Sequence, residues 1–119
     1  MIASDLINSA RLLTFDTAPD QQTWTDDQYL TALNDGLAFL YSRLSESRAT
    51  ENVGVLAFIP IAMADLGQTM LEDDTYWTFC VEFMACAFFS AGSRDTANRQ
   101  KAADHHANWM QAIMPSGGK

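Results

Sequence analysis

Apolar residues recur every three or four positions along two stretches in the first half of the chain, which is the spacing of a helix that buries one face. The first stretch predicts a helix over residues 4–13. The second predicts a helix that begins at Asp26, and turn-forming residues at 16–20 separate the two. The apolar stripe of the second helix consists of Leu30, Leu33, Leu37, Leu40 or Tyr41, and Leu44.

The start of the second helix carries a local signature. Thr25 and Gln28 have the spacing of a capping box, in which the threonine hydroxyl accepts a hydrogen bond from the Gln28 N–H and the glutamine side chain reaches back. Trp24 precedes the cap, where a hydrophobic staple onto Leu30 or one of its neighbours is expected. Thr25 is therefore predicted to cap this helix.

The signals conflict between residues 51 and 74. The run 53–59 is rich in residues that favour strands, and Pro60 can either close such a strand or take the first position of a helix. The sequence favours a short helix from Pro60 to about Leu66, with the strand as the alternative. The acidic residues 72–74 then suit the N-terminus of the next helix, where the helix dipole favours negative charge.

The most apolar stretch, residues 76–91, predicts a helix with no polar face. Its aromatic residues are Tyr76, Trp77, Phe79, Phe83, Phe88 and Phe89. A helix that is apolar all round lies at the centre of a fold or is also buried against a partner. Three short neighbours cannot easily cover it on every side, so these residues are predicted to form the core or a contact between subunits. A membrane span needs about 20 apolar residues, so none is expected here.

A last helix is predicted at residues 95–114, followed by a flexible tail at 115–119. Its expected inner face consists of Ala103, His106 or Ala107, Met110 and Ile113. The chain is thus predicted to be a single all-α domain over residues 1–119. We expect a small bundle of about four helices with an irregular central connection that has room for a short strand.

The charge of the chain limits its partners. The formal net charge is −8, and such a chain is repelled by phosphate, so a reader of nucleic-acid sequence is not expected. No Lys or Arg occurs between Arg48 and Arg94, although six acidic residues do. These acids form either a solvated face or a surface that repels DNA. The candidates for the second role are Asp65, Glu72, Asp73 and Asp74.

The sequence carries no familiar catalytic pattern, such as a glycine-rich phosphate loop, a paired CxxC or an HExxH motif. The adjacent His105 and His106 diverge by about 100° on a helix and are poorly placed to share a metal ion. Cys80 and Cys86 are six residues apart on one helix and are expected to stay unbridged. The chain is therefore not expected to be an enzyme or to use a cofactor or metal.

Glu82 is the one charged residue inside the aromatic helix. A buried carboxylate is costly unless it is paired. Glu82 is therefore expected to lie at a helix edge or to pair, for structural reasons, with one of three arginines. These are Arg94, Arg99 and Arg11.

Three segments together resemble the small head–tail connector, or adaptor, proteins of tailed bacteriophages. The first is SDLINSARLL at 4–13, followed by Asp16. The second is WTDDQYL at 24–30, continuing to LNDG at 33–36, where Gly36 stands in place of an expected alanine. The third is the aromatic helix at 76–91 with the alanine-rich, polar SRDTANRQKAA at 93–103. The resemblance rests on the order and spacing of the three segments.

The resemblance implies a structural virion protein that assembles in the host cytoplasm and is located at the head–tail junction. Such proteins form a ring, commonly of twelve copies, beneath the portal protein, and present a platform for the next neck or tail protein. The ring extends the channel through which double-stranded DNA passes without specific binding. In that setting Asp65, Glu72, Asp73 and Asp74 are predicted to face the channel.

Two other classes of protein share these features. A small helical dimeric regulator or partner-binding protein would have the same composition, but it would form a closed dimer. A metal-dependent enzyme would need a cluster of carboxylates and histidines, which Asp104, His105 and His106 only begin to supply. The assembled mass separates the first class from a ring, and metal analysis tests the second.

Overall fold

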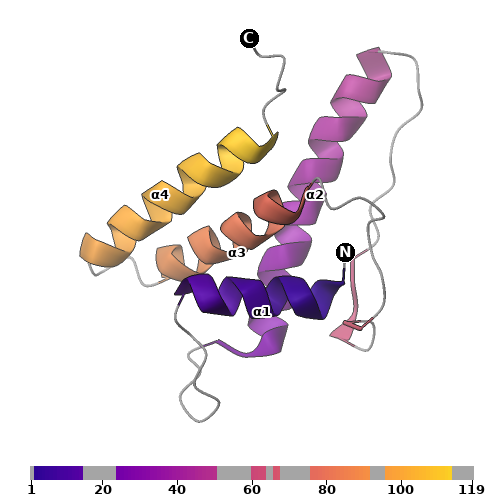
Figure 1. The fold of residues 1–119 in the computed structure, drawn as a ribbon. Helices are drawn as coiled ribbons and strands as arrows, with labels where there is room; N and C mark the ends of the chain where they lie inside the picture. Colours follow the sequence, from indigo (N-terminus) through magenta and orange to yellow (C-terminus); the bar gives the residue numbers. More distant parts are fainter. Residues whose placement is uncertain are drawn as a thin grey trace.

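The computed structural model describes residues 2–14, 24–50, 60–63, 66–67, 76–91 and 96–113. Four helices run through these residues, namely α1 (Ala3–Thr14), α2 (Asp26–Thr50), α3 (Trp77–Ala91) and α4 (Thr96–Ile113) (Figure 1). None of the described residues belongs to a β-strand, so the predicted all-α class is confirmed. The run 53–59, where a strand was the alternative, and the tail 115–119 lie outside the described residues.

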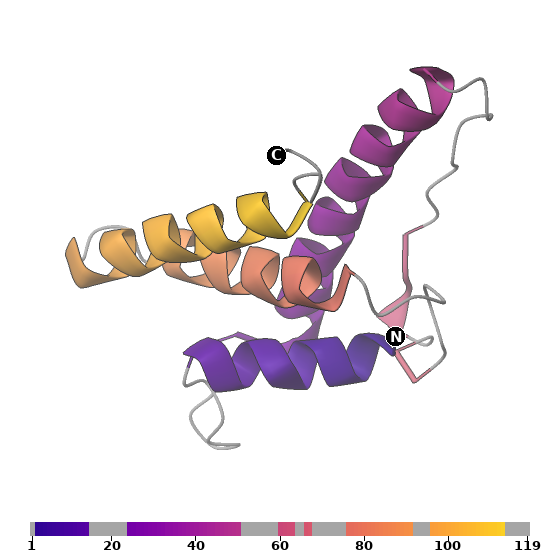
Figure 2. The ribbon, with the colours of Figure 1, turned by 45° about the horizontal axis from the view of Figure 1, so that its top comes forward.

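The helices are arranged in two layers. α1, α3 and α4 lie side by side with α3 in the middle, and α2 crosses behind them (Figures 1 and 2). The thinnest dimension of the molecule is 19 Å, which corresponds to two helices of about 10 Å diameter. The C-terminal end of α2 extends beyond the three-helix layer (Figure 2). α3 is thus the central element and packs against each of the other three.

The core forms where the apolar faces of α1 and α2 meet α3. α3 contributes Phe79, Cys80 and Met84, which are almost completely buried. The predicted stripe of α2 is buried as far as its described side chains extend, through Leu40. The buried residues of α1 and α2 in this core are Ala3, Leu6, Ile7, Ala10, Tyr29, Leu30, Ala32, Leu33, Leu37 and Leu40.

The predicted cap of α2 is confirmed. The Gln28 N–H donates to Thr25 Oγ1 at 3.2 Å, and the Thr25 N–H donates to Gln28 Oε1 at 2.8 Å. The Trp24 ring packs edge-on against Tyr29 with 5.2 Å between centroids, so the hydrophobic staple closes onto the residue before Leu30. The start of α2 is therefore determined by residues that are local in the sequence.

We expect Thr25→Ala to lower the free energy of unfolding by about 1 kcal/mol, because the first turn of α2 loses a hydrogen-bond acceptor. Urea denaturation followed by circular dichroism measures this loss. Thr31→Ala, at an exposed interior position of the same helix, is the matched control. It should be neutral or slightly stabilising because alanine favours a helix more than threonine does. Equal losses in the two variants would contradict the capping role.

Arg11 joins α1 to the beginning of α2. Although Arg11 is charged, it is buried, and its Nη2 donates to Asp26 Oδ1 at 2.7 Å. Its guanidinium also lies 4.6 Å from the centre of the Tyr29 ring. The hydroxyl groups of Thr14 and Tyr29 are hydrogen-bonded at 2.8 Å. These contacts fix the end of α1 on the first turns of α2 and leave Arg11 engaged with α2 rather than with Glu82.

The predicted short helix from Pro60 is wrong at its start, because residues 60–62 are not helical. The side chain of Asn34 on α2 occupies both backbone groups of Ile61. Its Nδ2 donates to the Ile61 carbonyl at 3.0 Å, and the Ile61 N–H donates to its Oδ1 at 2.9 Å. These two groups are therefore engaged with α2 and are not available for a helical hydrogen-bond ladder.

Gly36 allows α2 and α3 to approach closely. A Cβ atom added at Gly36 would lie 2.9 Å from Cδ1 and 3.0 Å from Cγ of Phe83, which is closer than van der Waals contact permits. The Phe83 ring has little room to move, because it packs against Phe79 and Trp109 with centroid distances of 5.7 and 5.1 Å. Gly36 therefore allows α2 and α3 to cross at close range, because it has no side chain at the point of contact.

Gly36→Ala should lower the free energy of unfolding by about 1 kcal/mol. The helix propensity of alanine offers about 1 kcal/mol of stabilisation, but overpacking against Phe83 costs about 1–3 kcal/mol. Thermal denaturation tests this. Asp35→Ala at the adjacent exposed position is the control. It gains the helix propensity of alanine without a clash against Phe83, so it should be neutral or stabilising. A Gly36→Ala variant more stable than the parent would mean that the helices cross at a greater separation.

The inner face of α4 differs from the prediction in its rotational register. Ala103, His106 and Ala107 are exposed, whereas Trp109 is buried and His105 is largely buried. Met110 and Ile113 are half-buried at the edge of the face, as predicted. The Trp109 ring packs against Phe39, Phe79 and Phe83 at centroid distances of 5.3, 5.6 and 5.1 Å. This large aromatic contact determines which side of α4 faces α3.

Candidate interaction surface

The aromatic residues of α3 and its first turn divide between the core and the surface. Phe79 and Phe89 are buried, and Phe83 packs against the core. Phe88 stacks on Tyr29 at 6.0 Å and meets Trp24 edge-on at 5.2 Å. Tyr76 and Trp77 are only half-buried. Phe83 and Phe88 have the same intermediate exposure but make ring contacts with neighbouring helices, whereas Trp77 lines a groove at the surface.

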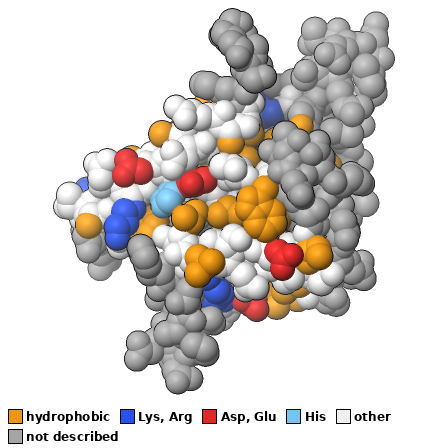
Figure 3. All heavy atoms as spheres, in the orientation of Figure 1, with side chains coloured by type: hydrophobic (Ala, Val, Ile, Leu, Met, Phe, Trp, Pro, Cys, Tyr) orange, Lys and Arg blue, Asp and Glu red, His pale blue; other side chains and the backbone are white. Residues whose placement is uncertain are grey.

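Trp77 lines a shallow groove between α1 and α3. The groove has a volume of about 310 Å³, and its lining residues are Ser9, Leu12, Leu13, Trp77, Thr78, Val81 and Glu82. Leu12, one of these lining residues, has 67% of its surface exposed. Hydrophobic side chains gather over α1 and α3 on this face of the molecule (Figure 3). We call this set of seven residues the α1/α3 groove.

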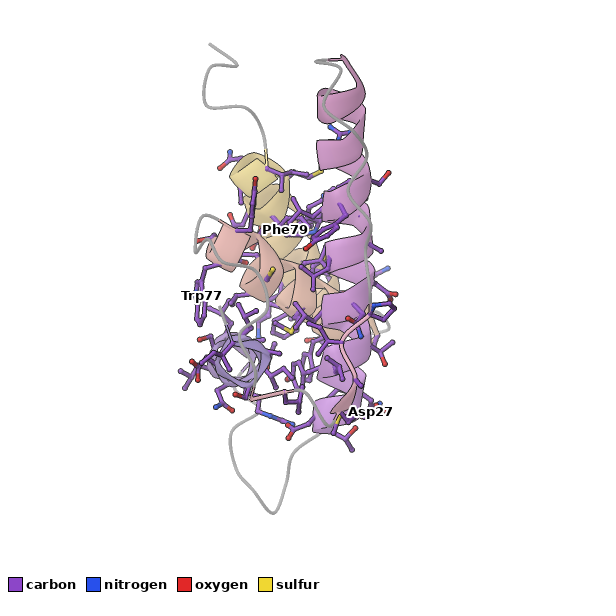
Figure 4. All side chains as sticks on the ribbon, turned by 90° about the vertical axis from the view of Figure 1, so that its right-hand side faces the viewer. Asp27, Trp77 and Phe79 are labelled. Atoms are coloured by element: carbon purple, nitrogen blue, oxygen red, sulfur yellow. The ribbon has the colours of Figure 1, made fainter. Side chains whose placement is uncertain are left out.

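The α1/α3 groove lies on the side of the molecule opposite α2. Trp77 points away from α2, whereas Phe79, two residues later, points toward it (Figure 4). The contact of Phe79 with Phe39 of α2, at 6.5 Å between ring centroids, agrees with this orientation. α3 thus presents one aromatic residue to the core and another to the outer surface within a single turn.

Glu82 forms the polar end of the groove, and its partner differs from the prediction. Glu82 Oε2 is paired with Nδ1 of His105 on α4, not with an arginine. The two side chains are only 15% and 16% exposed, respectively. The His105 ring stacks on Phe89 at 5.6 Å, with 5° between the ring planes. The pair therefore joins α3 to α4 in a largely desolvated position.

The Glu82–His105 pair should contribute about 1.5–3 kcal/mol to stability, the range for hydrogen bonds that involve a charged group. Glu82→Gln, His105→Ala and the double variant form a thermodynamic cycle whose coupling energy isolates the pair. We expect a coupling of about 1 kcal/mol or more in urea denaturation. His106→Ala, at the exposed neighbour, serves as the control and should cost less than His105→Ala. A coupling near zero would contradict the pairing.

The two cysteines are free thiols, as predicted. Burial raises the pKa of the Cys80 thiol to about 12, so this group remains protonated at neutral pH and behaves as a small apolar core residue. Cys86 is half-buried, and its Sγ lies 4.0 Å from the Ser90 hydroxyl. Nothing in this arrangement activates Cys80 as a nucleophile, since a reactive cysteine needs a lowered pKa.

No group of three or more His, Cys, Asp or Glu side chains that could hold a metal ion occurs among the described residues. His105 is engaged with Glu82, and His106 packs edge-on against Trp109 at 4.9 Å. No helix in the described part of the chain is long and apolar enough to cross a membrane. The predicted channel acids Asp65, Glu72, Asp73 and Asp74 lie outside the described residues.

Comparison of the chain with protein-family models, curated proteins and solved structures found no match. Sequence reasoning missed Leu12, which lies beside the predicted stripe of α1, and it missed the pairing of Glu82 with His105. A signal for the second was present, because Ala102, His105, Trp109 and Ala112 repeat at alternating three- and four-residue spacing.

Proposed function

We propose that this protein is a structural subunit that assembles into a ring between the portal and the neck or tail of a bacteriophage virion. The ring extends the DNA channel and helps to complete the head after packaging. The subunit acts by binding other proteins and not by catalysis. The segments 4–13, 24–36 and 76–103, which resemble the head–tail connector proteins, supply the class of this proposal.

The observation that carries the proposal is the α1/α3 groove. Exposed apolar patches on soluble proteins commonly mark contacts with other proteins. Leu12 is largely exposed, and the half-buried Trp77 lines the same groove and points away from α2 (Figure 4). An aromatic residue of this kind is a typical energetic centre of a protein interface. The groove supports a role in assembly, and the Glu82–His105 pair beside it already has a structural role.

The charge of the chain supports passage of DNA without binding. Contacts between phosphates and Lys or Arg supply most non-specific affinity for DNA, and a formal net charge of −8 opposes such contacts. A ring multiplies each acidic side chain by the number of copies. We propose that Asp65, Glu72, Asp73 and Asp74 face the channel, because they belong to the segment between Arg48 and Arg94 that lacks basic residues.

The assembled mass tests the ring. Analytical ultracentrifugation and native mass spectrometry of the purified protein, alone and mixed with a portal protein of a tailed phage, should give a species well above a dimer. A protein with a similar acidic charge and no ring-forming role serves as the control for non-specific association. A closed dimer that ignores the portal would instead support a small helical partner-binding protein, and a monomer under both conditions would contradict assembly.

The channel is tested in assembled particles. Replacing Glu72, Asp73 and Asp74 together with lysine should impair DNA ejection while rings still form, because lysines in the channel would bind phosphate. Replacing the exposed acids Asp27, Asp35 and Asp104 with lysine makes the same change in total charge on α2 and α4 and serves as the control. Normal ejection from intact particles that carry the triple variant would exclude a channel position for these acids.

A further inference from the structure

Helix α4 is attached to the rest of the molecule by few buried side chains. The structure describes all 18 of its residues, and of these only Trp109 is buried. The shorter helices α1 and α3 bury six residues each, although they have 12 and 15 residues in total. α4 runs alongside α3 (Figure 2), so its low burial does not come from distance. It comes from composition, because most residues of α4 are polar or alanine.

The core depends on α4 for only a small part of its buried residues. Among the described residues, the buried hydrophobic core consists of side chains from α1, α2 and α3, and Trp109 is the one contribution of α4. α3 packs against α1 and α2 as well as against α4. If α4 moved away, the other three helices would therefore still be packed on one another through the larger part of the core.

The other contacts of α4 are half-buried or reach the surface. Met110 and Ile113 are only partly buried against the core. The ammonium group of Lys101, an exposed residue, lies 5.2 Å from the centre of the Phe89 ring. Contacts that water can reach stabilise a helix less than fully buried apolar area does. The attachment of α4 thus depends mainly on Trp109 and on the Glu82–His105 pair.

α4 covers an aromatic part of the α3 surface. Phe79, Phe83 and Phe89 each have a ring contact with α4, the first two through Trp109 and the third through His105. We call these three phenylalanines the α3 strip. The α1/α3 groove, in contrast, is lined by residues of α1 and α3 alone. α4 therefore hides the α3 strip but contributes nothing to the lining of the groove.

We infer that α4 is a cover that opens from the α3 strip as a unit while α1, α2 and α3 remain folded. Proteins open in cooperative units, and a unit with few buried apolar contacts opens at a lower free energy than the whole domain unfolds. α4 is such a unit, because it adds one buried residue to a core that the other helices complete. Opening adds the α3 strip to the apolar surface that the subunit presents. The inference concerns a single subunit and is independent of the proposed ring.

Native-state hydrogen exchange of the wild-type protein at low urea concentrations tests the opening. The amides of α4 should have protection factors about tenfold or more below those of the slowest amides in α2 and α3. Their exchange should also depend less on urea, because opening one helix exposes less surface than unfolding the domain. Amides of α4 that have the same protection and the same urea dependence as the core amides of α3 would overturn the inference.

A variant away from α4 distinguishes opening of this helix from unfolding of the whole domain. Thr25→Ala removes the cap of α2, which is present in both the closed and the open form. It should lower the protection of the core amides about fivefold and leave the protection of α4 unchanged, since both forms lose the same hydrogen bond. Thr31→Ala, at an exposed position of the same helix, is the control and should lower neither. A loss of protection in α4 equal to that in the core of Thr25→Ala would overturn the inference, because α4 would then open only by global unfolding.

Discussion

Phe79→Ala should lower the free energy of unfolding by about 3–5 kcal/mol, the usual cost of replacing a fully buried phenylalanine with alanine. Phe79 is completely buried at the meeting point of three helices. Its ring packs against Phe39 of α2 at 6.5 Å, Phe83 of α3 at 5.7 Å and Trp109 of α4 at 5.6 Å. Alanine would leave a cavity that none of these helices can close alone. Small domains are stable by only about 5–15 kcal/mol, so this variant should be close to unfolding.

Trp77→Ala is the matched control for this prediction. Trp77 lies two residues before Phe79 but points to the opposite side of α3 (Figure 4). Because it is only half-buried, its replacement should cost the isolated subunit roughly 1 kcal/mol. The two variants should therefore differ in thermal stability, while Trp77→Ala alone should weaken assembly at near-normal stability. Equal losses of stability in the two variants would mean that the orientation of α3 is wrong.

The elements that the sequence predicts correctly are those whose determinants are close together in the chain. The capping box of α2 lies within four residues, and the stripe from Leu30 to Leu40 lies on one helix. Each signal depends on local geometry alone, so each is visible without knowledge of the rest of the fold. The sequence likewise predicts two separate helices at 76–91 and 95–114, because the composition changes from apolar to largely polar between them.

The errors arise where the deciding contact is distant in sequence. Residues 60–62 depart from a helix because Asn34, 27 positions before Ile61, binds its backbone. The partner of Glu82 is His105, 23 positions later, in preference to the arginines that simple charge pairing suggests. The spacing of Ala102, His105, Trp109 and Ala112 indicates the inner face of α4, but it does not indicate which helix meets that face. Both outcomes depend on which helices become neighbours.

The candidate surface is predictable only in part for the same reason. The apolar excess of 76–91 correctly indicates that α3 has more apolar surface than a single inner face needs. It does not distinguish Phe79, which faces α2, from Trp77, which faces outward. It also gives no role to Leu12, because the groove exists only once α1 lies beside α3. A docking surface made from two helices depends on their relative placement as well as on their composition.

Trp109→Ala should have the second large effect, a loss of about 3–5 kcal/mol in the free energy of unfolding. Trp109 is only 7% exposed, and it is the one buried residue of α4. It reaches both α2 and α3 through Phe39, Phe79 and Phe83, so its removal takes away the main apolar contact that holds α4 in place. The contacts that remain are smaller, and they include the Glu82–His105 pair, Lys101 over the Phe89 ring and the half-buried end of the helix.

The loss of stability in Trp109→Ala should be largest in α4 and smaller in the other helices, and this difference between helices can be measured. Hydrogen exchange followed by mass spectrometry should show faster exchange throughout α4 in Trp109→Ala, whereas α2 near its cap should change least, because segments with few buried contacts open first. Met110→Ala, at the adjacent half-buried position, serves as the control and should cost about 1 kcal/mol. If Trp109→Ala cost no more than Met110→Ala, or if α4 kept its protection, Trp109 would not be the anchor of this helix. A loss shared equally by all four helices would instead show that α4 unfolds only together with the rest of the domain.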